Sequence, residues 1–329
     1  MPKLSSPNGT LEYGPGHPTV LWSDYLRIID QPSIILEELM AGRIDIMVDL
    51  ARWVVKRGID ILTIMINHPR LDDVELASRI ARSVQKEVGC PLGIDGTRDP
   101  EAVEAFLSAL QPYNGLMLTI TGDQKELDTL LPIIKRYNAV VGVMPMGHFE
   151  PLLPLTAELR LKEAKYIVEV CEGYGISREN ISVDAIVLAA AALEPNSFQE
   201  TVDTIQSLHK ELGVTVQAGT WNTGHGLPEP RYMELAALMA CMTYGVDVAL
   251  VAPDTPGLIP CVRSMDFLKE RDVDQKVYFA SYRSRQAELK AGTAVEREFN
   301  WYPYDKKPKN EEGRGSPGKQ REKGSKLEL

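Results

Sequence analysis

Two aspartates are placed where they could hold a polar ligand. Asp95 lies in GIDGT (93–97) and Asp184 in VDA (183–185), each at the end of a short apolar run. Two carboxylates that converge on one cavity are costly to desolvate unless N–H donors pair with them. A ring rich in N–H groups, such as a pterin or a guanine, would satisfy both carboxylates. The alternative is that each aspartate caps the helix that follows it.

A third candidate, Asn222, lies in a long polar loop rich in glycine, GTWNTGHGLP (219–228). Glycine allows a ligand to approach the backbone closely, and the asparagine amide can both donate and accept hydrogen bonds. A role in forming a turn is the alternative for this asparagine. We interpret the loop as part of a binding site.

These residues need a scaffold that brings them together. Eight short, mostly apolar runs alternate along the chain with segments of helical period, as expected for strands covered on both faces. The runs span residues 19–28, 60–66, 91–95, 115–120, 139–145, 181–187, 214–219 and 247–253. This alternation predicts an α/β fold, a closed (β/α)8 or TIM barrel, whose strand carboxyl ends carry the active site. The rival, a doubly wound open sheet, usually has a GxGxxG or GxxxxGK[ST] turn, and the sequence has neither.

The helical segments show apolar residues at three- and four-residue spacing. The segment 33–58 ends at Gly58, a glycine suited to the end of a helix. The segment 72–89 starts with two aspartates, which favour a helix amino terminus, and ends at Gly89. Both segments are therefore predicted to be helices packed outside the barrel.

The barrel is predicted over residues 19–292. The first 18 residues are rich in Gly, Pro, Ser and Asn and lack a hydrophobic period, so we expect an extended arm over 1–18. The end of the chain, from Asp305 onward, is nearly devoid of apolar side chains and cannot offset the entropy lost on ordering. We therefore expect a disordered tail over 293–329.

Composition narrows the class of protein. The chain has 329 residues, of which 44% are hydrophobic and 25% charged, with a net charge of −10. This acidic balance argues against a nucleic-acid partner. No segment approaches the roughly 20 apolar residues that span a bilayer, so we expect a cytoplasmic protein with no membrane association.

His68 and His148 stand alone in the sequence, and no metal site is predicted. Reduced thiols are expected for the four widely separated cysteines, Cys90, Cys171, Cys241 and Cys261.

The sequence resembles the pterin-binding methyltransferases across about residues 19 to 285. This family includes the methyltetrahydrofolate:corrinoid/iron–sulfur protein methyltransferases, and the dihydropteroate synthases are more distant relatives. The resemblance is most specific in GTWNTGHGLP. It is also carried by GIDILTIMINHPRLDDVE (58–75), IDGT (94–97), TAELRL (156–161) and VDAIVL (183–188).

The resemblance implies a role for each candidate residue. Asp95 and Asp184 match the two carboxylates that bind the pterin ring, and Asn222 matches the asparagine near N5 of the folate. His225 falls where members of the family carry varied side chains that line the same pocket. Thr119 stands at the end of the fourth strand, where the family usually has Asn-Ser and where one amide contact to the pterin is lost.

Two further strand ends depart from the pattern of the family. The second strand usually ends in Asp-x-Asn-x-Gly, whereas this chain reads TIMIN (63–67), with Thr63 and Met65 at the altered positions. Ala185 replaces the proline that usually follows the second carboxylate. These changes indicate a different reduced pterin, a rebuilt methyl-donor site, or a loss of the parent reaction.

The family resemblance implies a methyltransferase that moves a methyl group between a corrinoid protein and tetrahydrofolate, or a related reduced pterin, by displacement at N5. Cobalamin would be carried by the partner corrinoid protein, and a homodimer is expected. One alternative is a methyltransferase that demethylates a small O-methyl or N-methyl compound onto a corrinoid protein. Another is a non-catalytic pterin-binding subunit. Dihydropteroate synthase ranks lower, because the loop 219–228 lacks a Lys or Arg for diphosphate.

Overall fold

Eight parallel strands close into a barrel in the computed structural model, which confirms the predicted fold. The structure describes residues 1–29, 31–65, 68–292 and 299. Neighbouring strands follow one another around the barrel in the order β10-β3-β4-β5-β6-β7-β8-β9, so each is paired with its neighbours in the sequence and the ring closes between β10 and β3. The strands are β3 (Val20–Arg27), β4 (Ile61–Met65), β5 (Leu92–Ile94), β6 (Leu116–Ile120), β7 (Val140–Val143), β8 (Ile181–Asp184), β9 (Thr215–Ala218) and β10 (Val248–Leu250).

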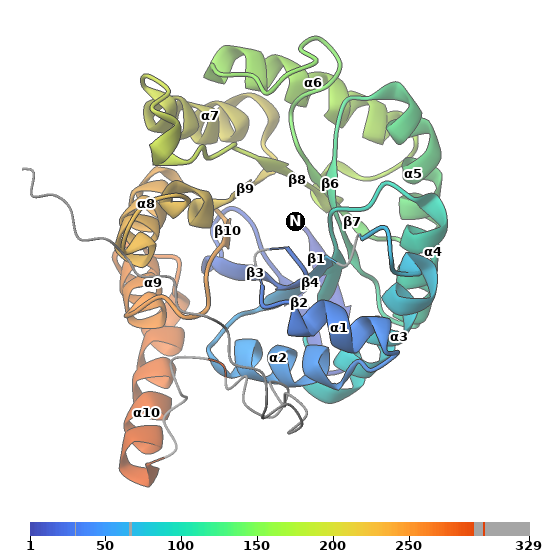
Figure 1. The fold of residues 1–329 in the computed structure, drawn as a ribbon. Helices are drawn as coiled ribbons and strands as arrows, with labels where there is room; N and C mark the ends of the chain where they lie inside the picture. The colour runs from blue at the N-terminus through green and yellow to red at the C-terminus, as the bar shows by residue number, and fades with distance from the viewer. Residues whose placement is uncertain (30, 66–67, 293–298, 300–329) are drawn as a thin grey trace, which may run out of the picture. The chain divides into compact units, whose positions relative to one another are not determined.

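Helices surround these strands (Figure 1). The α-helices are α1 (Ile34–Met40), α2 (Asp45–Lys56), α3 (Asp73–Val88), α4 (Pro100–Ala109), α5 (Gln124–Arg136), α6 (Ala157–Gly173), α7 (Ser197–Leu212), α8 (Pro230–Tyr244), α9 (Leu258–Leu268) and α10 (Lys276–Ala291). Four short 3-10 helices are η1 (Arg178–Asn180), η2 (Ala190–Ala192), η3 (Thr220–Gly224) and η4 (Val273–Gln275).

The helix limits follow local chemistry. At the start of α3, the Asp72 carboxylate accepts a hydrogen bond from the Glu75 N–H, and the helix ends at Gly89 in the left-handed conformation, as predicted. The single helix expected over 33–58 is wrong, because α1 and α2 are separate. Gly42 lies between them with a φ of 73°, a conformation that turns the chain out of the helix.

The first residues form an antiparallel hairpin instead of the expected extended arm. Its strands are β1 (Lys3–Ser6) and β2 (Gly9–Glu12). The Ser5 N–H donates to Asn114 Oδ1 at 2.7 Å, and Asn8 Nδ2 donates to the Val88 carbonyl at 3.1 Å. Asn114 precedes β6 and Val88 precedes β5, so the hairpin lies at the amino-terminal end of the barrel. This end is opposite the strand ends that carry Asp95 and Asp184.

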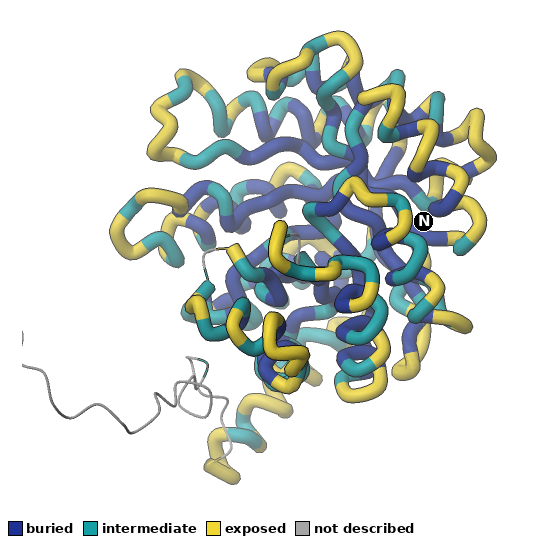
Figure 2. Tube along the Cα trace, turned by 45° about the vertical axis from the view of Figure 1, so that its right-hand side comes forward, coloured by how far each residue is buried: buried dark blue, intermediate teal, exposed yellow. Residues whose placement is uncertain are grey.

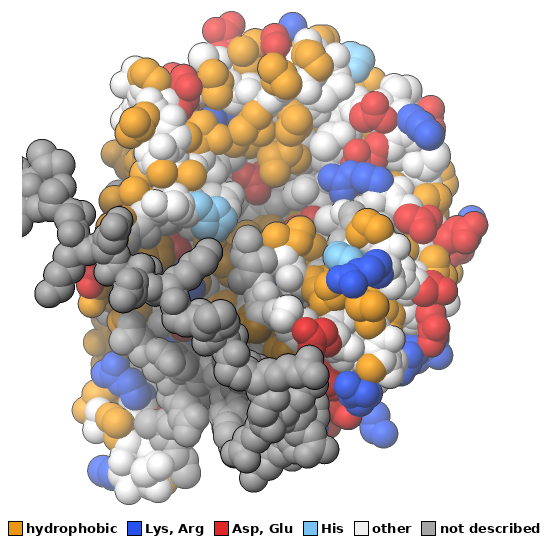
Figure 3. All heavy atoms as spheres, viewed as in Figure 1, with side chains coloured by type: hydrophobic (Ala, Val, Ile, Leu, Met, Phe, Trp, Pro, Cys, Tyr) orange, Lys and Arg blue, Asp and Glu red, His pale blue; other side chains and the backbone are white. Residues whose placement is uncertain are grey.

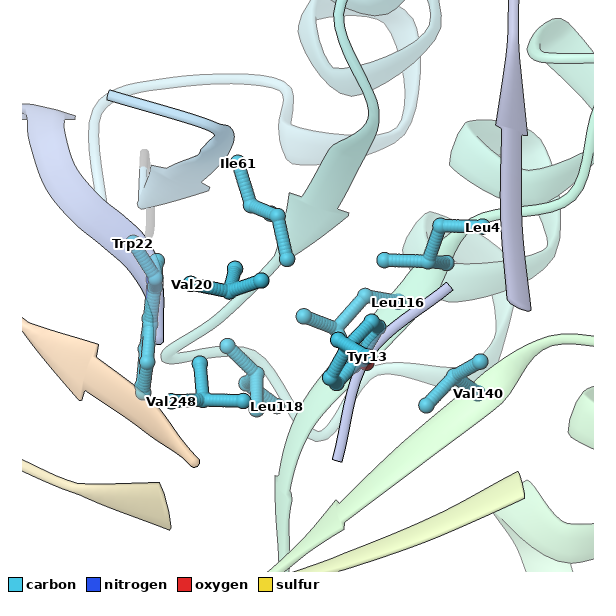
Figure 4. Close-up of a cluster of buried hydrophobic side chains, with 9 residues drawn as sticks. All are labelled: Leu4, Tyr13, Val20, Trp22, Ile61, Leu116, Leu118, Val140 and Val248. Atoms are coloured by element: carbon cyan, nitrogen blue, oxygen red, sulfur yellow. The ribbon is translucent and has the colours of Figure 1, made fainter. Parts of the chain in front are cut away.

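The hairpin contributes side chains to the interior of the barrel. Leu4 and Tyr13 are 0% and 1% exposed, and both point into a cluster of strand residues (Figure 4). The other members of this cluster are Val20, Trp22, Ile61, Leu116, Leu118, Val140 and Val248. Burial is concentrated in the strands and the inner faces of the helices (Figure 2). The interior of the barrel is therefore closed by apolar packing at its amino-terminal end.

The predicted end of the barrel domain and the predicted tail lie at the limit of the described residues. Residues Met1–Phe299 group into one unit by their contacts, and the predicted tail over 293–329 lies outside the described residues apart from Phe299. The Phe299 ring lies 6.1 Å from the Trp53 ring of α2. Within the described part of the chain, no helix is long and apolar enough to cross a bilayer.

Tyr13→Ala should lower the free energy of unfolding by about 3 to 5 kcal/mol, because it removes a fully buried ring from the core. Urea denaturation measures this change. Lys3→Ala is the matched control in the same hairpin, since Lys3 is exposed and pairs with Glu12 at the surface. An unchanged midpoint for Tyr13→Ala would show that the hairpin is not part of the core.

Candidate functional site

Asp95 lies directly after β5 at the carboxyl-terminal end of the barrel. Its N–H donates to the Ile64 carbonyl at 3.0 Å, and its carboxylate accepts from the Gly96 N–H at 2.7 Å. The cap of the following helix, α4, is Asp99, which accepts from the Glu101 N–H. The alternative of a helix-capping Asp95 is therefore wrong. Burial raises the pKa of Asp95, and the neighbouring Asp24 carboxylate raises it further.

Asp184, the last residue of β8, is 6% exposed. Its Oδ1 accepts from the Ile186 N–H at 2.6 Å, and its Oδ2 lies 3.5 Å from Gln217 Nε2. The next α-helix begins only at Ser197, so this carboxylate does not cap it. Burial raises the pKa of Asp184 to about 6, against the opposing effect of these hydrogen bonds and of Arg160. A substantial fraction of this carboxyl is protonated below that pH.

The predicted residues of strands β5, β6 and β8 come together. Asp95 and Asp184 are close enough that the charge of Asp95 raises the pKa of Asp184. The backbone of Thr119 in β6 is close enough to the Asp95 carboxylate to lower the pKa of that carboxyl. Acidic side chains and a histidine lie inside the ring of helices on this face (Figure 3). The barrel thus gathers two carboxylates and a backbone donor at one set of strand ends.

Two residues of this site escaped the sequence analysis. Asp24 in β3 is 4% exposed, and its Oδ2 accepts from Arg27 Nη1 at 3.0 Å. Gln217 in β9 is 1% exposed and accepts from Ser182 Oγ at 2.8 Å while its amide faces Asp184. The available signal was a polar side chain inside an otherwise apolar run, which marks an inward-facing position in a barrel strand.

Asn222 lies in η3, beside the backbone that follows β8. Its Nδ2 donates to the Val187 carbonyl at 3.4 Å, near the upper limit for a hydrogen bond. A Cβ atom on Gly219 would stand 2.8 Å from this nitrogen, so glycine is needed for the close approach of the amide. The Asn222 N–H also donates to the Gly219 carbonyl within the turn. The amide therefore lies next to the Asp184 strand end with one weak contact.

His225 lies in a cleft beside η3, at the same end of the barrel as the carboxylates. This cleft has a volume of about 520 Å³, and its described walls do not include Asp95, Asp184 or Asn222. Trp221 forms part of it, with the Arg27 guanidinium 4.3 Å from its ring and the His225 ring 6.0 Å away. The structure thus separates His225 from the carboxylate pair and gives it an aromatic and cationic setting.

A larger cavity of about 870 Å³ lies outside the barrel, between α2, α9 and α10. Its walls include Gly58, Asp60 and Ile259, none of which follows the carboxyl end of a barrel strand. Chemistry in this fold takes place at the strand ends. We therefore assign the functional site to the Asp95 and Asp184 end despite the greater volume of this outer groove.

The altered strand ends have different surroundings. Thr63 is fully buried and accepts a hydrogen bond from the indole of Trp22 at 2.8 Å, which ties it to the interior of the barrel. The Met65 side chain packs against Gly96, next to Asp95. Ala185 is buried and its N–H donates to the Gln217 carbonyl. Residues 66 and 67 lie outside the described part of the chain.

The described residues include no group of three or more His, Cys, Asp or Glu side chains placed to hold a metal ion. Cys90, Cys171 and Cys241 are buried free thiols, and Cys261 is half-buried.

Comparison with known structures gives the class of protein. The chain has the fold of the dihydropteroate synthases. It matches the Xanthomonas albilineans enzyme in complex with indole-2-carboxylic acid and 6-chloroguanine with a TM-score of 0.58 at 18% identity, over 82% of this chain and 97% of that one. It matches the Coxiella burnetii enzyme in complex with pteroic acid with a TM-score of 0.57 at 15% identity, over 83% of this chain and 100% of that one.

Sequence comparison points to a more particular relative. The chain is 25% identical to the methylcorrinoid:tetrahydrofolate methyltransferase of Eubacterium limosum over 202 residues, which cover 61% of this chain and 73% of that protein. No family model matches the sequence. The resemblance to pterin-binding barrels is therefore confirmed at the level of fold and distant relationship.

Asp184→Asn should stabilise the protein more at pH 7 than at pH 4. A carboxyl whose pKa is raised on folding is neutral in both states at low pH, and its stabilising protonation is lost as the pH rises from about 4 through about 6. The wild type should therefore lose about 3 kcal/mol relative to the variant across this range. Urea denaturation at both pH values gives the difference in unfolding free energy between the variant and the wild type. An equal difference at pH 4 and pH 7 would contradict a raised pKa for Asp184.

Proposed function

We propose that this chain is a methyltransferase that moves a methyl group between a corrinoid protein and tetrahydrofolate or a related reduced pterin. The observation that carries the proposal is the pair of carboxylates, the half-buried Asp95 and the buried Asp184, at the same end of the barrel, with the amide of Asn222 beside the backbone that follows Asp184. The relationship to the Eubacterium limosum enzyme, whose name states this reaction, supports it.

The carboxylates suit the edge of a pterin ring. Pteroic acid and 6-chloroguanine, bound by two structural relatives, both carry a 2-aminopyrimidine edge with N–H donors. A carboxylate that has lost most of its water binds such donors strongly, because hydrogen bonds to an ionised acceptor gain strength in a medium of low dielectric constant. Asp95 and Asp184 would fix the plane of the ring, with Thr119 on the same wall.

Asn222 would act at the reacting nitrogen. In the direction named for the relative, the N5 lone pair would attack the methyl group, the carbon–cobalt bond pair would stay on cobalt as Co(I), and N5 would release its proton to water. In reverse, a tertiary amine leaves poorly unless charge on N5 is stabilised. A preorganised amide supplies that stabilisation without a net charge. Its present 3.4 Å contact with Val187 is weak enough to be exchanged for a ligand.

The methyl carrier would arrive on another protein. Cobalamin enters this proposal as a substrate carried by a corrinoid partner. The cleft at Trp221 and His225 lies at the same end of the barrel as the carboxylate pair, so it is suited to the part of the ligand that projects from the ring. The homodimer and the cytoplasmic location stay predictions.

A second candidate is demethylation of a small O-methyl or N-methyl compound onto a corrinoid protein. The observation that favours it is the changed chemistry of β4. Thr63 accepts a hydrogen bond from Trp22 inside the barrel, and Met65 packs beside Asp95. An apolar side chain next to the carboxylate would reshape the site for a different substrate. A non-catalytic pterin-binding subunit is the outcome if binding occurs without transfer.

Wild-type protein should bind tetrahydrofolate with a Kd on the order of micromolar, and Asp95→Ala should abolish the binding because ring N–H donors lose their acceptor. Isothermal titration calorimetry measures both. Asp99→Ala is the matched control, since this aspartate lies four residues away and its carboxylate caps α4. Absence of heat for any tetrahydropterin with the wild type would end the pterin proposal.

Asn222→Ala should slow methyl transfer between methylcobalamin and tetrahydrofolate by about 10² to 10³ while leaving folate affinity nearly unchanged, as expected for an interaction made in the transition state. The change in cobalt absorbance follows the reaction. Asn196→Gly provides a control at an exposed asparagine outside the site. Equal losses of rate and affinity would assign Asn222 to binding alone.

A further inference from the structure

Helix α6 carries two charged side chains that are completely buried. Arg160 and Glu163 are both 0% exposed, although they lie three residues apart on an outer helix of the barrel (Figure 1). Charged residues are almost never fully buried unless partners surround them, because desolvation is costly. The hydrogen-bond partners of Arg160 and Glu163 should therefore show what compensates their burial.

Arg160 binds the backbone that follows β8. Its Nη1 donates to the carbonyls of Ala185 and Ile186 at 3.0 and 3.1 Å, and its Nε donates to the Pro154 carbonyl at 2.9 Å. The guanidinium thus fastens the loop after β7 to the loop after β8. Thr201 Oγ1 adds a hydrogen bond to the same Ile186 carbonyl at 2.7 Å.

The residue held by these hydrogen bonds, Ile186, has a strained backbone conformation. Ile186 has a φ of 56°, in the left-handed region that β-branched residues rarely adopt. Such a conformation persists only where the surroundings hold it in place. The N–H of Ile186 is the group that donates to Asp184 Oδ1 at 2.6 Å. The conformation held by Arg160 therefore presents the donor that orients the carboxylate.

We propose that Arg160 is a positioning residue that orients Asp184 toward the ligand by holding the carbonyl groups of Ala185 and Ile186. This inference rests on the proposed function, because it gives Asp184 the task of binding the pterin ring. Arg160 itself has no exposed surface, so it acts through the backbone and through its charge.

Glu163 provides an internal comparison. Its carboxylate accepts from the N–H groups of His148, Phe149 and Glu150 at 3.2, 2.7 and 2.7 Å. It is as buried as Arg160 and lies on the same helix, but it holds only the loop after β7. A change at Glu163 should cost stability in a similar way without touching the Asp184 strand end.

Several groups set the protonation of Asp184. Arg160 favours the ionised form, whereas Asp95 and burial favour the neutral form. The Gln217 amide faces Asp184 from β9, the Cys241 thiol is close to it on α8, and Glu200 on α7 faces Arg160. Loss of Arg160 removes the positive charge from this set, so the pKa of Asp184 should rise further.

The test begins with unliganded protein. The Asp184 carboxyl is titrated by carbon-13 NMR, its signal being identified by its absence in Asp184→Asn. Arg160→Met should raise the titration midpoint by about one pH unit, Arg160→Lys should raise it less, and Glu163→Gln should leave it unchanged. Tetrahydrofolate affinity at pH 7 should fall about tenfold in Arg160→Met and stay near the wild-type value in Glu163→Gln.

The outcomes separate the two proposals. If Arg160→Met loses stability but leaves both the Asp184 midpoint and the affinity unchanged, Arg160 is only structural and the inference is overturned. If Arg160→Met does not fold, Thr201→Val removes one bond to the same Ile186 carbonyl and should shift the midpoint and the affinity in the same direction by less. No shift in that variant also overturns the inference. Failure of the wild type to bind tetrahydropterins would end the proposed function, while the NMR result would still report on Arg160.

Discussion

Burying the Asp184 carboxylate at the end of β8 costs free energy, and the surrounding structure is arranged to reduce that cost. The Ile186 N–H and the Gln217 amide face its two oxygens, and Arg160 supplies a positive charge nearby. The compensation is incomplete, since the pKa still stands at about 6. A carboxyl held in this way remains available to a ligand that brings its own N–H donors.

The two ends of the barrel have separate tasks. At the amino-terminal end, the hairpin places Leu4 and Tyr13 against strand residues, so that end is filled with apolar side chains. At the carboxyl-terminal end, Asp24, Asp95 and Asp184 come together, and a histidine-bearing cleft lies at the same end. This division is the usual one for the fold, in which stability and chemistry lie at opposite rims. The packed end allows the other end to keep costly buried charges.

Two of the departures from the family pattern, Thr63 and Met65, lie in β4. Thr63 has become part of the interior through its bond with Trp22, and Met65 packs against Gly96, whereas the Asp184 side keeps its network of backbone and amide contacts. Two further departures, Thr119 in β6 and Ala185 directly after Asp184, lie at other strand ends, so the departures surround both carboxylates while the contacts of Asp184 are kept. This pattern is consistent with a related chemistry on an altered substrate.

The sequence by itself determined the barrel and the placement of Asp95 and Asp184, because strand and helix periods are local and the fold sends strand carboxyl ends to one rim. It also gave the limits of α3 through its cap and its glycine. Only the tertiary structure decided that residues 3–12 form a hairpin and that Asp24 and Gln217 join the site. The same holds for Arg160, whose partners Ala185 and Ile186 lie 25 and 26 residues away. Such contacts depend on how distant segments pack, and the identity of a single residue does not encode its partner.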